Sequence, residues 1–176
     1  PQKKCLVSLR NIQKKFPQMQ IHSVGVSNVN KRAQLSIGNH SEIATFSNKF
    51  QASYTSNSVY WNDSEDVEVI SISRLINTFG VPKFMKIDVE GYESIILKAL
   101  TSKISYIEFE CTSQFVKESI SIIYHLKSLG ETYYNYIHNE QPKLMLKYWI
   151  SADEMINLLK SMDGDLIHIN IFVKTL

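Results

Sequence analysis

The sequence has few of the residues that mark disordered, fibrous or cross-linked chains. Its 176 residues contain six glycines and four prolines, about half the usual share, which excludes collagen-like, linker and disordered classes. Two cysteines, Cys5 and Cys111, are too few for a disulfide framework or a structural zinc site. No apolar run approaches the roughly 18 residues of a membrane span, and no signal-peptide pattern is present. We therefore expect a globular domain in a reducing compartment, the cytoplasm.

Acidic residues are missing from the start of the chain. The net charge is only +2, yet the first 41 residues hold seven Lys and Arg and no Asp or Glu. The apolar and basic side chains of residues 3–16 fall on opposite arcs of a helical wheel, which favours an amphipathic helix with a solvated face. The interleaved aromatics of single-strand binders are absent. We expect neither a nucleic-acid partner nor a membrane partner.

Strand-like and helical patterns alternate along most of the chain. The predicted strands are 19–26, 33–37, 67–72, 83–89, 104–111, 132–138 and 166–173. The predicted helices are 3–16, 74–79, 92–100, 115–129 and one that opens with a capping box at Ser151 and Glu154. The alternation predicts βαβ units and a parallel sheet. Residues 40–66 are rich in Ser, Asn and Thr and are typical of a long surface excursion.

Carboxylates stand at the ends of two consecutive predicted strands. Asp88 ends one of them and Glu110 ends the next, and neighbouring strands would hold the two roughly 5–10 Å apart. Such a pair can accept protons, hold hydroxyl groups or bind a hard divalent cation. The alternative is a purely structural role, in which Asp88 caps the following helix while Glu90 and Glu93 stabilise its first turn.

Other candidate residues carry weaker patterns. The five histidines are scattered with no i, i+4 pair, which argues against zinc. Trp61 is a candidate for stacking on a ligand, and Cys111 is typical of a buried thiol. All six glycines are isolated, so the chain offers no phosphate-binding loop of its own.

The run KIDVEGYE at 86–93, preceded by ISRL at 72–75 and GVP at 80–82, resembles the signature of the FkbM family of S-adenosylmethionine-dependent methyltransferases. Weaker similarity extends over VGVS at 24–27, IEFE at 107–110 and WISADEM at 149–155. The resemblance implies an α/β, Rossmann-like class I methyltransferase fold. Such a fold has a mostly parallel sheet with an antiparallel C-terminal strand, flanked by helices.

The resemblance also implies a reaction and its site residues. The reaction is methyl transfer from S-adenosylmethionine to a hydroxyl of a sugar or secondary metabolite, so the expected partner is a small-molecule or glycan acceptor. The residues implied for catalysis are Asp88, Glu90 and Glu110, those for the cofactor are Ser27, Asn28 and Asp88, and those for the substrate are Glu93 and Trp61. Some proteins of this fold use a divalent cation, but no metal-ligand pattern indicates one here.

The sequence departs from the family pattern in two places. Ser73 stands where the family has an aspartate. The family's first strand and glycine-rich loop should lie upstream of Pro1, and the sequence does not contain them. We therefore expect residues 1–176 to be a single, partial methyltransferase domain, a fragment with an open sheet edge that binds the cofactor weakly.

Two other functions stay open at this stage. One is a non-catalytic relative that binds a glycan or a protein partner without methyl transfer. The other is a metal-dependent phosphoryl-transfer or hydrolase domain that uses Asp88 and Glu90. Binding of S-adenosylhomocysteine would count against the second.

Overall fold

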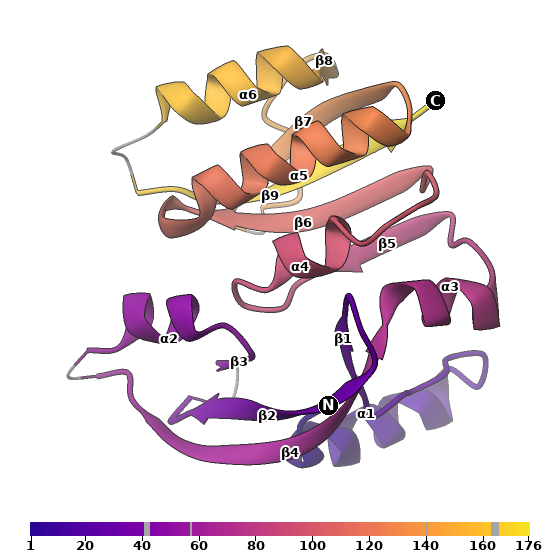
Figure 1. Cartoon of the computed structure of the whole chain (residues 1–176), viewed down its shortest axis with the longest axis vertical. Helices are drawn as coiled ribbons and strands as arrows, with labels where there is room; N and C mark the ends of the chain where they lie inside the picture. Colours follow the sequence, from indigo (N-terminus) through magenta and orange to yellow (C-terminus); the bar gives the residue numbers. More distant parts are fainter. Residues whose placement is uncertain (41–42, 57, 140, 163–165) are drawn as a thin grey trace.

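The strands form two separate sheets, one above the other in Figure 1. This computed structural model describes residues 1–40, 43–56, 58–139, 141–162 and 166–176. The four-stranded sheet has the order β1 (Gly25–Ser27), β4 (Trp61–Ser71), β2 (Lys31–Gly38) and β3 (Ala44–Thr45). The five-stranded sheet has the order β5 (Phe84–Ile87), β6 (Tyr106–Thr112), β9 (His168–Thr175), β7 (Thr132–His138) and β8 (Ile150–Ser151).

Both sheets are mixed, so the expectation of one mostly parallel sheet is wrong. Within the described residues, β1 pairs with β4 and β5 pairs with β6 in parallel, and the other pairings are antiparallel. The physical reason lies in β9, which enters between β6 and β7 in the opposite direction. β6 and β7 run the same way, but β9 separates them. The expected antiparallel C-terminal strand is present.

Helices cover one face of the five-stranded sheet. They are α4 (Glu93–Leu97), α5 (Val116–Leu129), preceded by the 3-10 turn η1 (Ser113–Phe115), and α6 (Ala152–Ser161). Alternation along β6 turns Ile107, Phe109 and Cys111 into the core, where each is at most 1% exposed. Burial raises the pKa of the Cys111 thiol to about 11. The residues between them, Glu108 and Glu110, belong to the opposite face.

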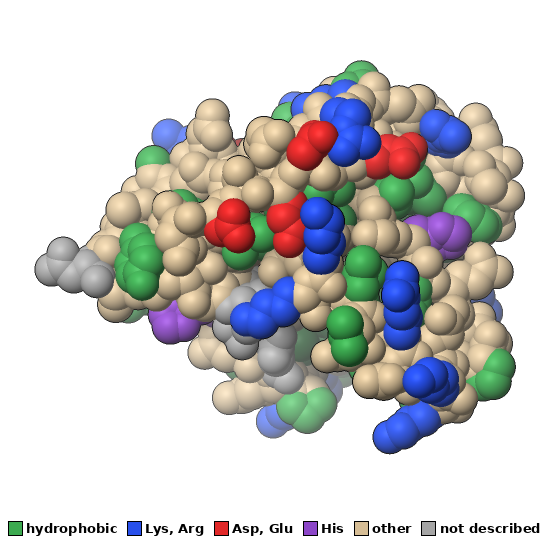
Figure 2. All heavy atoms as spheres, turned by 90° about the horizontal axis from the view of Figure 1, so that it is seen from below, with side chains coloured by type: hydrophobic (Ala, Val, Ile, Leu, Met, Phe, Trp, Pro, Cys, Tyr) green, Lys and Arg blue, Asp and Glu red, His purple; other side chains and the backbone are tan. Residues whose placement is uncertain are grey.

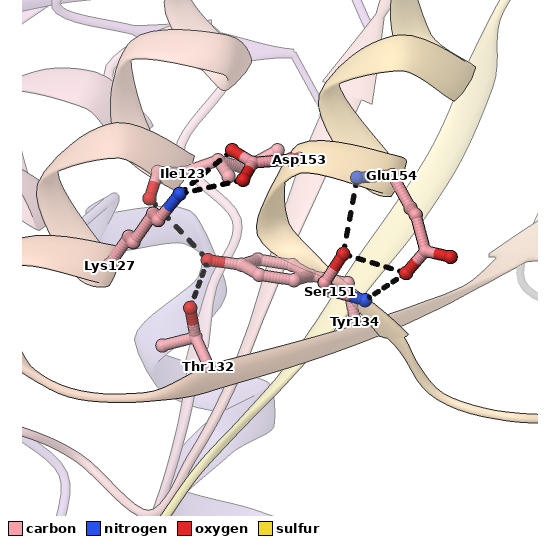
Figure 3. Close-up of polar contacts among 7 residues, drawn as sticks. All are labelled: Ile123, Lys127, Thr132, Tyr134, Ser151, Asp153 and Glu154. Atoms are coloured by element: carbon pink, nitrogen blue, oxygen red, sulfur yellow. Dashed lines mark hydrogen bonds and ion pairs between the residues drawn. The ribbon is translucent and has the colours of Figure 1, made fainter.

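The predicted capping box at the start of α6 is confirmed. Figure 3 shows the Ser151 hydroxyl accepting from the Glu154 amide at 3.4 Å, while the Glu154 carboxylate accepts from the Ser151 amide at 2.8 Å. Lys127 of α5 lies 2.8 Å from Asp153, which ties α5 to α6. This corner of the molecule therefore forms as the local sequence predicts.

The four-stranded sheet is more thinly covered. Helix α1 (Lys3–Lys15) forms as predicted, but none of its residues is buried. Figure 2 shows this end of the molecule from below, with Lys and Arg side chains scattered over the face and several Asp and Glu side chains among them. The predicted 40–66 excursion is partly wrong, because this stretch contains β3, helix α2 (Asn48–Tyr54) and the first part of β4.

The strands β1 and β5 each stand at the edge of their sheet. β1 is also shorter than the predicted 19–26 strand. Between the two edges lies a groove lined by Val26, Leu75 and Met85, among other apolar residues, with helix α3 (Ile72–Phe79) along its side. The expected open, apolar sheet edge is thus present in the described structure. None of the helices in the described ranges is long and apolar enough to cross a membrane.

Candidate functional site

The turn from β5 into α4 has an unusual backbone. Glu90 has φ 54° and Gly91 has φ 82°, both in the left-handed region, which non-glycine residues seldom adopt. A Cβ at Gly91 would lie 2.6 Å from the Phe115 ring. Glycine is therefore required at 91 for both its conformation and the close approach of Phe115.

The side chain of Glu93 holds this turn from inside. Its carboxylate accepts hydrogen bonds from the amides of Val89 at 3.1 Å and Gly91 at 3.3 Å. The side chain is buried, and this burial raises the pKa of Glu93 to about 7, against the lowering effect of the backbone hydrogen bonds. Glu93 thus fixes the shape of the turn that precedes α4.

A further hydrogen bond ties the turn to the other sheet. The hydroxyl of Thr45, on β3, donates to the carbonyl oxygen of Glu90 at 2.7 Å. The same hydroxyl accepts from the amide of Ser47 at 2.8 Å. The turn that follows β5 is therefore also attached to β3 of the four-stranded sheet.

A cavity of about 510 Å³ opens beside this turn. Its polar lining includes the carboxylates of Asp88, Glu90 and Glu110 together with His168. Its apolar lining includes Val26, Leu35, Ala44, Phe46 and Val89. The volume is that of an ordinary small-molecule site. The two sheets contribute opposite walls, since Leu35 comes from β2 and Glu110 from β6.

Glu90 is the most perturbed acid of the cavity. Burial raises the pKa of its carboxyl to about 8, and the carboxylates of Glu110 and Asp88 act in the same direction. At neutral pH this group is therefore largely protonated and can donate a hydrogen bond as well as accept one. Asp88 is half-exposed and lies 3.4 Å from the Lys86 ammonium, which also lies 3.4 Å from Glu108.

Glu110 has a partner on the neighbouring strand. Its Oε1 lies 2.7 Å from Nε2 of His168, at the start of β9. The Glu110 side chain is 16% exposed and that of His168 is 56% exposed. A nearly buried carboxylate thus holds a solvent-accessible imidazole at the wall of the cavity.

The structure brings together some of the predicted site residues and separates others. Asp88, Glu90 and Glu110 line one cavity, because β5 and β6 are parallel neighbours. Ser27 is fully buried and contacts Asn28 and Tyr92. Asn28 is exposed beside another hollow, which Ser94 and Lys98 also line.

Trp61 is also separate from the cavity. Its indole nitrogen donates to the Thr55 hydroxyl at 3.1 Å, and its ring meets the edge of Phe50. It lies at the start of β4 and not in a loop. Its assignment to substrate binding, like that of Glu93 and the cofactor assignment of Ser27 and Asn28, stays a prediction.

Sequence reasoning missed His168 and Thr45. The Glu110–His168 contact joins residues 58 positions apart, so no local spacing could reveal it. The alternation of His168, Asn170 and Phe172 with the apolar Ile169 and Ile171 is the one available signal, since it sets His168 on the face opposite the core. Thr45 lies in a polar stretch with no pattern that marks it.

No group of three or more His, Cys, Asp or Glu side chains in the described parts of the chain is arranged to hold a metal ion. The arrangement can accept hydrogen bonds from hydroxyl or ammonium groups, favour positive charge and transfer protons.

The comparisons with known proteins point to one family. The family model described as the methyltransferase FkbM domain matches residues 1–162. The match includes the four-stranded sheet, the five-stranded sheet without β9, and every acidic residue of the cavity. No curated protein matches the chain.

Proposed function

Because the chain belongs to the FkbM methyltransferase family, we propose that it is an S-adenosylmethionine-dependent methyltransferase that acts on a hydroxyl oxygen of a sugar or secondary metabolite. The observation that carries this proposal is the meeting of Asp88, Glu90 and Glu110 on one cavity at the carboxyl ends of β5 and β6. Ligands of α/β sheets bind at such strand ends.

The chemistry of the cavity fits the cofactor. S-adenosylmethionine supplies an electrophilic methyl group on a positively charged sulfur, and it also carries an ammonium group and ribose hydroxyls. The carboxylates of Asp88 and Glu110 suit these positive and hydrogen-donating groups. The apolar side chains of Val26, Leu35 and Phe46 suit a flat heterocycle.

The roles of the acidic residues follow from their surroundings. Asp88, half-exposed and beside Lys86, is the carboxylate that we assign to the cofactor. Glu90, whose pKa burial raises to about 8, offers a protonated carboxyl that can donate to an oxygen of the acceptor. The acceptor is a small molecule or a glycan, bound in the part of the cavity near Glu110.

Calorimetric titration of S-adenosylmethionine into the chain, beside the Asp88→Ala variant, tests the proposal. We expect weak but measurable binding by the natural sequence and about tenfold weaker binding by Asp88→Ala, because one charge-assisted contact is lost. The matched control is Asp153→Ala, which removes an exposed carboxylate on α6, far from the cavity lining, and should bind as the natural sequence does.

The titration also separates the proposal from its alternatives. A folded chain that binds neither S-adenosylmethionine nor S-adenosylhomocysteine would contradict it and favour a non-catalytic module that binds a glycan or a partner. Equal binding by the natural sequence and Asp88→Ala would contradict the assigned role of Asp88. Mg²⁺-dependent activity without S-adenosylmethionine would favour phosphoryl transfer or hydrolysis.

A further inference from the structure

We propose that His168 is the base that takes the proton from the acceptor hydroxyl, and that Glu110 is the positioning residue that orients it. This inference rests on the proposed function. Its structural basis is the contact of 2.7 Å between Glu110 Oε1 and His168 Nε2, together with the place of both residues in the lining of the cavity that contains Asp88 and Glu90.

The hydrogen bond selects one tautomer of His168. An ionised carboxylate has no proton to give, so Nε2 of the imidazole must carry the hydrogen that the bond contains. In the neutral ring this leaves Nδ1 with a free lone pair. Glu110 thereby orients the ring, fixes which nitrogen is the base, and stabilises the positive charge that appears when the base is protonated.

The position of the ring suits a proton acceptor. In the reaction, the hydroxyl oxygen bonds to the methyl carbon as the carbon–sulfur bond of the donor breaks, the sulfonium becomes a neutral thioether, and the hydroxyl proton moves to Nδ1 of His168. The side chain is 56% exposed, so the imidazolium can then release this proton to solvent. No other histidine lines the cavity among the residues that the structure describes.

The carboxylates of the cavity are less suited to this role. Glu90, whose pKa is raised to about 8 by burial, holds its own proton at neutral pH. Asp88 is paired with the Lys86 ammonium at 3.4 Å and is the carboxylate assigned to the cofactor. Glu110 is already the acceptor of the His168 hydrogen bond.

Several other titratable groups lie near His168, so the test must distinguish their effect on the pH dependence of activity from that of His168. Glu110 faces it from β6, and Asp88 and Glu90 face the same cavity from the turn after β5. Tyr54 of α2 lies near enough to Glu110 to feel its charge. His138 ends β7, the strand beside β9, where it pairs in register with Ile169.

The geometry is tested first, by NMR without any acceptor. Long-range proton–nitrogen correlation spectra of the ¹⁵N-labelled chain, with His168 assigned from its loss in His168→Gln, should show a protonated Nε2 and an unprotonated Nδ1. The Nε2 proton should exchange slowly with water, and Glu110→Ala should make that exchange fast. A proton on Nδ1 at neutral pH, or exchange unaffected by Glu110→Ala, would overturn the proposal.

The role is tested by transfer from S-adenosylmethionine labelled with tritium in its methyl group to methyl glycosides and catechol. For His168→Gln we expect kcat to fall about 100-fold or more with KM nearly unchanged. We also expect the pH profile of His168→Gln to lack the fall in activity at acidic pH that the natural sequence shows. Glu110→Gln keeps a hydrogen-bond acceptor but no charge, so its kcat should lie between those of the natural sequence and His168→Gln. The control His138→Gln should keep the natural profile.

The outcomes distinguish the two proposals. Activity of His168→Gln within a few-fold of the natural sequence, with an unchanged pH profile, would overturn the role of His168 and leave the methyltransferase proposal standing. A natural sequence that binds no S-adenosylhomocysteine would instead overturn the proposed function, and with it this inference.

Discussion

The two sheets differ sharply in how many buried apolar residues surround each of them. The main cluster of buried apolar residues begins at Ile72 and is built from the five-stranded sheet and helices α4, α5 and α6. Before Ile72, the buried apolar side chains are those of Leu35, Phe50, Val67 and Val69. The five-stranded sheet, with the larger core, is therefore the rigid support of the site. The four-stranded sheet, with few buried apolar residues, forms the other wall and should be the less stable region.

Matched Leu→Ala substitutions give the most direct measure of this difference. Leu159 is 0% exposed on α6 and Leu35 is 3% exposed on β2. We expect Leu159→Ala to cost about 4 kcal/mol of unfolding free energy and Leu35→Ala about 2 kcal/mol, because the Leu35 side chain also borders an open cavity. Urea unfolding followed by circular dichroism measures both. Equal costs would contradict the contrast between the sheets.

Gly91→Ala tests the junction of the two regions. The new methyl group would meet the Phe115 ring at 2.6 Å, at a φ of 82°. We expect a loss of about 2–3 kcal/mol, from overpacking and from the left-handed backbone together. The control is Gly80→Ala, at φ 85° with no atom near the added Cβ, so it isolates the backbone cost. A loss no larger than that of the control would mean that Phe115 simply moves aside.

Glu90→Gln is expected to have an effect on stability that depends on pH. The pKa of Glu90 is raised to about 8, so the folded chain keeps a proton that the unfolded chain releases near pH 4.5. The group therefore destabilises the fold progressively as pH rises through that interval. Glu90→Gln should raise the melting temperature at pH 9 and leave it nearly unchanged at pH 4.

Two features sharpen that measurement. Glu68→Gln, at an exposed position of β4 opposite Arg32, removes a carboxyl group without a buried site and should change the melting temperature little at either pH. Glu93, whose pKa is raised to about 7, remains in the variant, so part of the pH dependence should persist. A melting temperature of Glu90→Gln that is lower than that of the natural sequence at pH 9 would refute the expected sign.

Local patterns predicted much of the rigid region. The 132–138 strand and the Ser151 capping box appear at the predicted residues, since turn, cap and periodicity are local properties. The meeting of Asp88 and Glu110 followed from two consecutive strands that pair in parallel. The insertion of β9 between β6 and β7 could not be predicted in this way, because the order of strands depends on contacts between distant segments.

The four-stranded sheet was harder to predict from the sequence. Exposed positions of β4, such as Asn62 and Ser64, are polar, so composition alone made this strand look like a loop. The tie between Thr45 and Glu90 and the pair of Glu110 with His168 both join the site across elements. Such contacts exist only once the sheets are assembled.

The burial of Cys111 gives the protein a built-in reporter. The thiol is 0% exposed in the centre of the rigid region, and its raised pKa leaves almost no thiolate at neutral pH. Cys5, the other cysteine, is half-buried on α1. A thiol-specific reagent should therefore mark Cys5 promptly and Cys111 only during rare openings of the core. Once Cys5 is blocked, the rate at which the reagent labels Cys111 measures how often the core opens, with no cysteine introduced by mutation.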